Sequence, residues 1–292
     1  MTTSDAKALP SGARAIPIQG VAARLVAYMD ASLAVPTATS FRDVPVARLM
    51  AERAALNAAL APRRLSYTHF IAYAVVQAAV VHPVMTSYFQ DLDGRPQRIE
   101  PARVGLGIAV DTEQRDGSPF LMVPVIHAAD EVSFAEFTAA YDDLVQRARS
   151  GRLTADDLVG GTITLTNPGT MGTTASVPRL MAGQGSIIAT GAIRGGAGER
   201  LMTISSTYDH RIIQGAVSGR FLHTLEEFLE GADGFYEAVA ESVSPAGSVG
   251  AAAASAIFAE AGTRVTSSRP QPATATPALT SSPTSNEVAG AV

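Results

Sequence analysis

The stretch Asp209-His210-Arg211 combines residue types suited to proton transfer. It follows the β-rich run LMTISSTY and precedes IIQG and a helical pattern that begins near Ala216. A histidine at the end of a strand, directly before a glycine turn, can project into a cleft while rigid elements hold its ring. His210 is therefore the first candidate for a catalytic side chain.

A second stretch of interest runs from Thr162 to Ile193, with the sequence TITLTNPGTMGTTASVPRLMAGQGSIIATGAI. One strand is expected to end at Thr166-Asn167, and a second is expected to begin at Ser186. Nearly 20 residues rich in Gly and small hydroxyl side chains connect the two strands. A long connection of this kind between two predicted strands more often serves a function than not.

The other four histidines offer weaker signals. His69 and His82 lie at the two ends of an apolar helical segment, where structural roles are expected. His127 follows a strand and His223 lies on a C-terminal helix, where a solvated or hydrogen-bonded ring is expected. The sequence contains neither H-x-x-x-H nor H-E-x-x-H and has no cysteine, so it predicts no metal site.

Composition excludes several functions. With 22 basic and 27 acidic residues the 292-residue chain has a net charge of −5, which argues against nucleic-acid binding. Lys7 is the single lysine and lies in a polar leader, which argues against a Schiff base or a lipoyl-bearing lysine in this chain. No segment has 18 uninterrupted apolar residues, so no membrane association and a cytoplasmic location are expected.

Three regions are expected along the chain. Residues 1–16 read as a flexible leader and residues 17–243 as one ordered domain. Residues 244–292 are dominated by Ala, Ser, Thr, Pro and Gly, a low-complexity composition that predicts disorder.

Hydrophobic periodicity within 17–243 alternates between helical and strand patterns. Helices are predicted at 21–33, 46–60, 68–81, 133–149 and 216–229, and strands at 36–41, 105–110, 121–126, 162–166, 186–193 and 202–207. Ser133 with Glu136, and Thr154 with Asp157, have the spacing of capping boxes. Because the strands cluster instead of alternating with helices, an α+β fold with a mixed, largely antiparallel sheet covered by helices is predicted. No G-x-G-x-x-G follows a strand, which argues against a dinucleotide-binding fold.

Several segments together resemble the catalytic domain of the dihydrolipoamide acyltransferases of 2-oxo acid dehydrogenase complexes. They are VPTATSFRDVP, LSYTHFIAYAVVQA, LTNPGTMGT, SVPRLMAGQG and STYDHRIIQGAVSG. They look most similar to the acyltransferase region of the fused, multifunctional 2-oxoglutarate dehydrogenase of some bacteria. The likeness extends from about Gly20 to Tyr236. It implies a chloramphenicol-acetyltransferase-like two-layer sandwich and a homotrimer with active sites between subunits.

The resemblance also implies roles for individual residues. His210 would be the general base, and Thr166 the hydroxyl that stabilises the oxyanion, donated by the neighbouring subunit. Both would act on an acyl group, succinyl by analogy, that moves between a dihydrolipoyl arm and CoA as substrates, with no metal. Supporting residues would be Asp209, Arg211, Gln214, Asn167 and Gly215. Fixed positive charge for the CoA phosphates would come from Arg179 or Arg194.

Two features depart from most members of that family. Gln214 stands four residues after His210, where most members have Asp, although the fused bacterial form also has Gln there. The connection from Ile193 to Leu201 looks shorter than in the fused enzymes. The segment GFYEAVAES resembles the beginning of a decarboxylase region, but no thiamine-diphosphate pattern follows it. A lipoyl domain and a thiamine-dependent decarboxylase are therefore expected as partners in trans.

Two alternatives remain at this stage. The chain could be a trimeric scaffold core of a 2-oxo acid dehydrogenase assembly with little turnover, or a chloramphenicol-acetyltransferase-like enzyme with a small hydroxyl or amine acceptor. The presence of both His210 and Thr166 argues against the scaffold, and the match beyond the histidine motif argues against the small acceptor.

Overall fold

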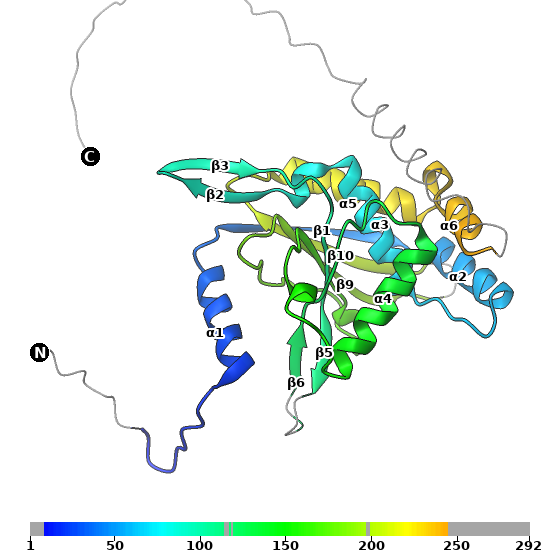
Figure 1. Cartoon of the computed structure of the whole chain (residues 1–292). Coiled ribbons are helices and arrows are strands. Elements are labelled where there is room, and N and C mark those ends of the chain that lie inside the picture. The colour runs from blue at the N-terminus through cyan, green and yellow to red at the C-terminus, as the bar shows by residue number, and fades with distance from the viewer. Residues whose placement is uncertain (1–8, 114–116, 118, 197–198, 245–292) are drawn as a thin grey trace, which may run out of the picture.

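A six-stranded mixed sheet forms the centre of the fold, in a computed structural model that describes residues 9–113, 117, 119–196 and 199–244 (Figure 1). In spatial order the strands are β1 (Thr37–Pro45), β10 (Leu201–Asp209), β9 (Ser186–Arg194), β8 (Ile163–Thr166), β4 (Leu106–Ile108) and β7 (Val125–Ile126). Strand β8 runs parallel to both of its neighbours, and the other pairs are antiparallel. The predicted α+β fold with a largely antiparallel mixed sheet is confirmed.

Two hairpins lie outside this sheet, and neither was predicted as a hairpin from the sequence. Strands β2 (Tyr88–Leu92) and β3 (Arg95–Ile99) form one, and β5 (Val110–Glu113) and β6 (Pro119–Met122) form the other. Asp93 and Gly94 connect β2 to β3 with φ values of 54° and 75°. An Asp-Gly pair suits such a turn because glycine adopts positive φ at little cost.

Five helices pack together along one side of the sheet (Figure 1). They are α2 (Ala47–Ala59), α3 (Tyr67–Val81), α4 (Phe134–Arg149), α5 (Gly215–Leu229) and α6 (Phe235–Val243). Single-turn 3₁₀ helices occur at Pro83–Thr86, Asp156–Leu158, Pro168–Met171 (η3) and Ala232–Gly234. The predicted Ser133–Glu136 capping box is confirmed at the start of α4. Helix α6 was not predicted.

Strand register separates an apolar from a polar side of the sheet. Leu165 of β8 lies beside Ile188 of β9, and both belong to the buried core beneath the helices. The next row points the other way, because successive side chains of a strand alternate between faces. That row crosses the sheet as Thr166, Ala189, Ser205 and Phe41. Phe41 is 53% exposed, so an apolar side chain stands on the face without helices.

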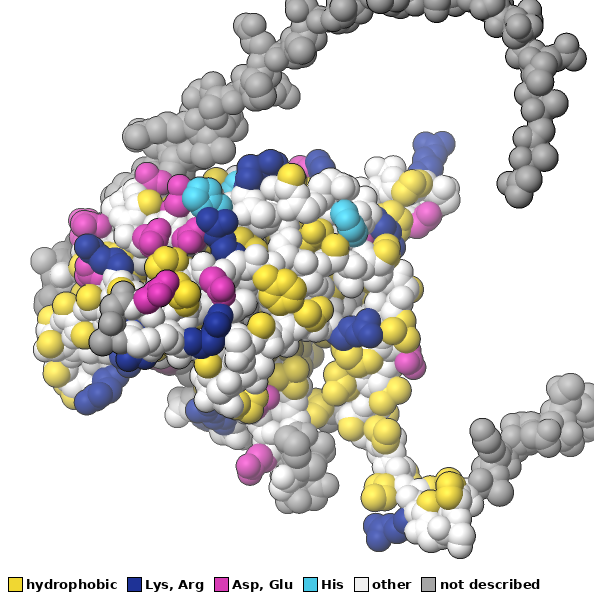
Figure 2. All heavy atoms as spheres, turned by 180° about the vertical axis from the view of Figure 1, so that it is seen from behind, with side chains coloured by type: hydrophobic (Ala, Val, Ile, Leu, Met, Phe, Trp, Pro, Cys, Tyr) yellow, Lys and Arg dark blue, Asp and Glu magenta, His cyan; other side chains and the backbone are white. Residues whose placement is uncertain are grey.

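The N-terminal helix α1 (Gly20–Ser32) projects away from the sheet and the other helices (Figure 1). Figure 2 shows that this projecting segment is rich in exposed hydrophobic side chains. Val26 is 44% exposed, Tyr28 is 52% exposed, and Leu33, just after the helix, is 67% exposed. These exposures show that α1 lacks the packing that ordinarily stabilises a helix. An isolated helix of this length is only marginally stable in water.

The predicted tail lies outside the described residues from 245 onward, as do residues 1–8 of the predicted leader. The boundaries at 17 and 243 therefore stay predictions. Among the described helices, none is both long and apolar enough to cross a membrane.

Candidate active site

His210 directly follows β10, and a hydrogen bond fixes its ring. Its backbone N–H donates to the carbonyl of Pro36 (2.9 Å), which ties the end of β10 to the start of β1. Its Nδ1 lies 3.0 Å from the carbonyl oxygen of Ile213. A carbonyl only accepts hydrogen bonds, so Nδ1 carries the proton and Nε2 keeps its lone pair. The exposed ring therefore presents a basic nitrogen.

Asp209 and Arg211 hold the backbone on the two sides of His210. The carboxylate of Asp209 accepts bonds from Arg211 Nε (2.9 and 3.1 Å) and Nη2 (2.6 Å) and from the Arg211 backbone N–H (3.0 Å). Asp209 is only 2% exposed. The Arg211 guanidinium also stacks on the Phe89 ring at 3.9 Å, so the β2–β3 hairpin contacts this turn. Such planar, bidentate pairs fix geometry as well as charge.

Gln214 and Gly215 begin helix α5. Gln214 is the N-cap, and its carbonyl accepts from Val217 N (2.9 Å) and Ser218 N (3.2 Å). Its side chain is exposed and makes no cap hydrogen bond. A Cβ on Gly215 would lie 3.4 Å from the Tyr208 hydroxyl, which is ordinary contact. Gln214 thus lies four residues after His210, at the end of the turn, with an exposed side chain.

Thr166 and Asn167 lie at the end of β8, where the sequence predicted them. Thr166 is half-buried, and the Asn167 amide donates to the hydroxyl of Thr68 near the start of α3 (2.9 Å). This bond fixes the turn that follows Thr166.

Within one chain, the structure does not bring Thr166 and His210 together. Thr166 is level with Ser205 across the sheet, two strands away, and His210 lies five residues beyond Ser205. At about 3.3 Å per residue and about 4.8 Å per strand, their Cα atoms lie roughly 19 Å apart. A general base at His210 and an oxyanion donor at Thr166 would both have to reach one reacting carbonyl, which this separation within one chain does not allow.

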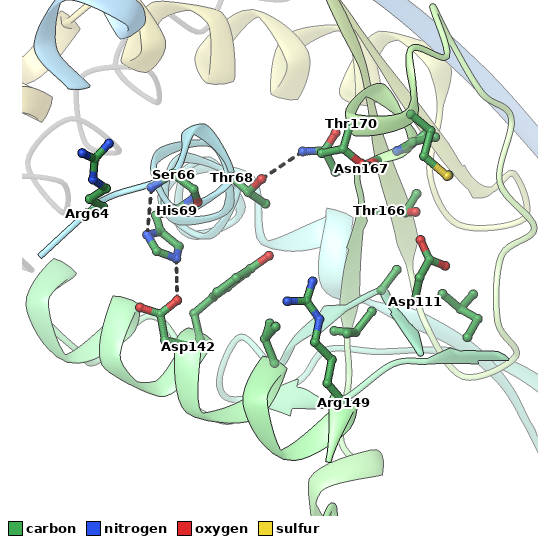
Figure 3. Close-up of a pocket in the computed structure, with 17 residues that line it drawn as sticks. Arg64, Ser66, Thr68, His69, Asp111, Asp142, Arg149, Thr166, Asn167 and Thr170 are labelled. Carbon is green, nitrogen blue, oxygen red and sulfur yellow. Dashed lines mark hydrogen bonds and ion pairs between the residues drawn. The ribbon is translucent and has the colours of Figure 1, made fainter. Parts of the chain in front are cut away.

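A pocket of about 520 Å³ opens beside Thr166 (Figure 3). Its walls come from the start of α3, the inner face of α4, the β5–β6 hairpin and the turn after β8. Its lining residues are Arg64, Ser66, Thr68, His69, Ala109, Val110, Asp111, Leu121, Tyr141, Asp142, Val145, Arg149, Thr166, Asn167, Pro168, Thr170 and Met171. His210 is not among them. Sequence reasoning missed the pocket, because its residues are scattered over more than a hundred positions.

His69 lies in this pocket but has no free nitrogen. Its Nδ1 accepts the Ser66 backbone N–H (3.3 Å), and its Nε2 donates to Asp142 (3.0 Å). Burial lowers the pKa of His69, against the opposing effect of Asp142. Burial also raises the pKa of the neighbouring Tyr141 to about 12, so its hydroxyl stays protonated. His69 therefore joins α3 to α4 and does not act as a base.

His82 fulfils the structural role that the sequence predicted. Its Nε2 lies 2.9 Å from the Thr224 hydroxyl, which links the end of α3 to α5. Burial and then the positive charge of Arg220 lower its pKa to about 4. The ring is neutral at neutral pH.

The candidate arginines differ in whether they form ion pairs within the chain and in whether they line the pocket. Arg194 bonds to Asp43 (2.8 Å) and to Thr203, which argues against it as a phosphate ligand. Arg179 is exposed on the loop before β9 and does not line the pocket. Arg64 and Arg149 do line it, and within the described part of the chain neither has an ion pair. No local pattern in the sequence distinguishes these two from the other arginines.

The described residues include no group of three or more His, Cys, Asp or Glu side chains arranged to hold a metal ion. The chemistry that the site offers is that of an imidazole base, a hydroxyl donor and guanidinium groups.

Comparison with known proteins agrees with this chemistry. Residues 10–236 match the family model of the 2-oxoacid dehydrogenases acyltransferase (catalytic domain). The chain is 43% identical over 244 residues to the 2-oxoglutarate dehydrogenase E1/E2 component of Corynebacterium glutamicum. That alignment covers 78% of the chain and 20% of the relative. The chain is also 46% identical over 237 residues to a multifunctional 2-oxoglutarate metabolism enzyme of Mycobacterium sp. (strain JLS). That alignment covers 75% of the chain and 19% of the relative. The chain spans about a fifth of the length of these relatives.

Solved structures agree in fold. A probable dihydrolipoamide acetyltransferase of Listeria monocytogenes is 28% identical with a TM-score of 0.68, over 76% of this chain and 96% of that one. The dihydrolipoamide acetyltransferase of Azotobacter vinelandii is 28% identical with a TM-score of 0.67, over 74% of this chain and 91% of that one. In that enzyme a serine, a histidine and the asparagine four residues after it were investigated for catalytic roles. Gln214 has the same spacing from His210. The chain belongs to the family of 2-oxoacid dehydrogenase acyltransferase catalytic domains.

Proposed function

We propose that the chain transfers an acyl group between a dihydrolipoyl thiol and the thiol of coenzyme A. His210 serves as the general base and Thr166 as the oxyanion donor. The observation that carries the proposal is the Nδ1–H bond of His210 to the Ile213 carbonyl, which leaves Nε2 basic. The membership of the chain in the acyltransferase family supports the same reaction.

The reaction needs one proton shuttle and one oxyanion donor. His210 Nε2 takes the thiol proton of CoA, and the thiolate attacks the thioester carbonyl of the S-acyl-dihydrolipoyl group. The carbonyl oxygen becomes negatively charged and accepts a hydrogen bond from the Thr166 hydroxyl. The C–S bond to the dihydrolipoyl sulfur then breaks, and this sulfur receives the proton from His210. The Ile213 carbonyl stabilises the imidazolium formed in between.

A ring of identical subunits would supply the two groups to one site, with His210 from one copy and Thr166 from the next. Three observations support this arrangement. The two residues are roughly 19 Å apart in one chain by strand spacing. Thr166 shares the helix-free face of the sheet with the exposed Phe41. Helix α1 presents unpacked apolar side chains. We propose a homotrimer.

The proposed acyl group is succinyl, because relatives that share 43% and 46% identity are 2-oxoglutarate enzymes. The lipoyl arm and the thiamine-dependent decarboxylase are proposed as partners in trans, in the cytoplasm. Lys7, the single lysine, lies outside the described residues. For the CoA phosphates we propose Arg64, since it stands in the pocket without an ion pair.

The test is thioester exchange with the purified chain. Succinyl-CoA and dihydrolipoamide are mixed with wild type, His210→Ala and Thr166→Ala, and release of CoA is followed. We expect about 10²- to 10⁴-fold lower kcat in His210→Ala and about 10²-fold lower kcat in Thr166→Ala. A wild-type rate in His210→Ala would refute the general-base role.

Co-expression of the two inactive variants tests the shared site. Mixed trimers contain some interfaces with an intact His210 and an intact Thr166, so about a quarter of wild-type activity should return in a ring with heterologous contacts. Mixtures assembled from separately purified, non-exchanging trimers are the control. No recovery in co-expressed trimers of confirmed mixed composition would show that both residues act within one chain.

A further inference from the structure

We infer that Arg149 is the residue that selects the acyl group, by binding the distal carboxylate of a dicarboxylic acyl chain whose thioester carbonyl lies at Thr166. The inference deepens the proposed function and rests on it. Arg149 and Thr166 line the same pocket, and Figure 3 shows Arg149 rising from α4 between Asp142 on one side and Asp111 with Thr166 on the other.

Helix periodicity places Arg149 in this wall. Tyr141, Val145 and Arg149 are spaced four residues apart along α4, and all three line the pocket. Residues at this spacing form one ridge on a helix. The preceding residue, Ala148, is buried at 3% exposure and anchors the last turn of α4 against the core. The guanidinium therefore extends from a fixed backbone position.

The charge of Arg149 is available for a ligand, in contrast to that of its neighbour Arg147. Arg147 contacts Asp143 at 2.7 Å and Asp157 at 2.6 Å. Within the described residues Arg149 has no such partner. Asp142, the nearest carboxylate on α4 in this pocket, is bound by His69 at 3.0 Å. A guanidinium without a carboxylate partner is suited to bidentate recognition of a ligand carboxylate.

The rest of the pocket limits where such a carboxylate can lie. Asp111 stands on the Thr166 side in Figure 3 and repels a second negative charge there. Val110, Leu121 and Val145 provide apolar contacts for a methylene chain. A chain with its carbonyl at Thr166 therefore places a distal carboxylate toward Arg149. Arg64, on the far side of His69 in Figure 3, is left for the CoA phosphates.

The experiment compares two thioesters that share CoA and differ in the distal carboxylate. Succinyl-CoA and acetyl-CoA are each titrated into wild type and Arg149→Gln by calorimetry, and each is then used as donor to dihydrolipoamide. We expect Arg149→Gln to lower affinity and kcat/KM for succinyl-CoA by about 10- to 100-fold, the range for a hydrogen bond to a charged group. The values for acetyl-CoA should change by less than about 2-fold, since that ligand has no group for Arg149 to bind.

Three further variants sharpen the result. Arg149→Lys keeps the charge and should retain part of the preference for succinyl-CoA. Asp111→Asn removes a like charge from the pocket and should tighten succinyl-CoA more than acetyl-CoA. Arg152→Gln is the matched control, because Arg152 is an exposed arginine just after α4 that bonds to Ser150 (2.9 Å) and does not line the pocket.

Equal losses for both thioesters in Arg149→Gln would overturn the inference and assign Arg149 to the CoA phosphates. Unchanged values for both would remove Arg149 from the site. Either result leaves the proposed reaction standing if wild type transfers acyl groups. If the wild type transfers neither acyl group, the proposed function is wrong. The assignment of Arg149 is tested separately by the titrations, and it is wrong if Arg149→Gln does not weaken succinyl-CoA binding more than acetyl-CoA binding.

Discussion

At the scale of single residues, Asp209 holds the backbone that flanks His210. Its nearly buried carboxylate binds the backbone and the guanidinium of Arg211, so the residues on both sides of the catalytic candidate are held. The side chain of Arg211 is 31% exposed, so solvent screens part of this pair. The pair therefore contributes to positioning as well as to stability.

We predict that Asp209→Asn destabilises the fold and misplaces the base. The neutral amide keeps one acceptor oxygen but loses the bidentate charge pair. The free energy of unfolding should fall by about 2 kcal/mol, and kcat should fall about 10-fold because His210 shifts. Urea denaturation and steady-state kinetics measure the two effects. Glu100→Gln breaks the exposed Arg98–Glu100 pair and serves as the control, with a change below about 0.5 kcal/mol. Wild-type stability and kcat in Asp209→Asn would contradict this role.

At the scale of elements, the close packing of η3 on β9 positions the turn after Thr166. A Cβ added to Gly169 would lie 2.3 Å from the backbone carbon and oxygen of Gly191 and 2.6 Å from the nitrogen of Ala192. The Ala192 N–H also donates to the Thr173 carbonyl (2.8 Å). Only a glycine at position 169 permits this approach of the two backbones.

We predict that Gly169→Ala moves η3 away from β9 and displaces Thr166. The clash involves backbone atoms, which cannot turn away as a flexible side chain can. A loss of about 1–3 kcal/mol in unfolding free energy is expected, with about 10- to 100-fold lower kcat. Gly219→Ala is the control, because a Cβ there meets nothing within 4 Å on α5. Equal behaviour of the two variants in thermal unfolding and kinetics would show that the contact has no role.

At the scale of the whole molecule, α1 and the helix-free face of the sheet leave apolar side chains exposed in the single chain. Burial of such side chains contributes about 25 cal/mol for each Å² removed from water. A second copy of the chain would offer this burial and, in the proposed homotrimer, would also supply the other half of the site. Assembly and catalysis are coupled in that proposal.

We predict that Val26→Asp combined with Leu33→Asp dissociates the trimer. Charged side chains at an apolar interface are costly to bury, so light scattering after size exclusion should report a monomer. Activity should be lost although His210 and Thr166 are intact, and circular dichroism should stay unchanged. Arg24→Asp adds an acidic residue at an already polar position of α1 and should leave the trimer intact. A trimer in the double variant would show that α1 does not mediate assembly.

Much of the local structure follows from the sequence, because helical and strand periodicities are properties of short segments. The segment around Ser133 shows this, since its capping box and apolar spacing predicted α4 to within a residue. The segment 121–126 shows the limit. It was predicted as one strand, but β6 ends at Met122 and β7 begins at Val125, because Pro124 cannot donate a ladder hydrogen bond. The β2–β3 hairpin was missed although Asp93-Gly94 signalled its turn.

The sequence by itself also determined His210 as a candidate, since it stands at the end of a predicted strand before a glycine turn, and the resemblance to the acyltransferase family added Thr166. Only the tertiary structure decided that the two are far apart in one chain, because strand order and register are set by long-range pairing. It likewise decided that Arg149 and Arg64 face the pocket while Arg194 is paired with Asp43. One arginine resembles another in a sequence. Only packing against distant segments determines which guanidinium pairs with a carboxylate of the chain and which is available to bind a ligand.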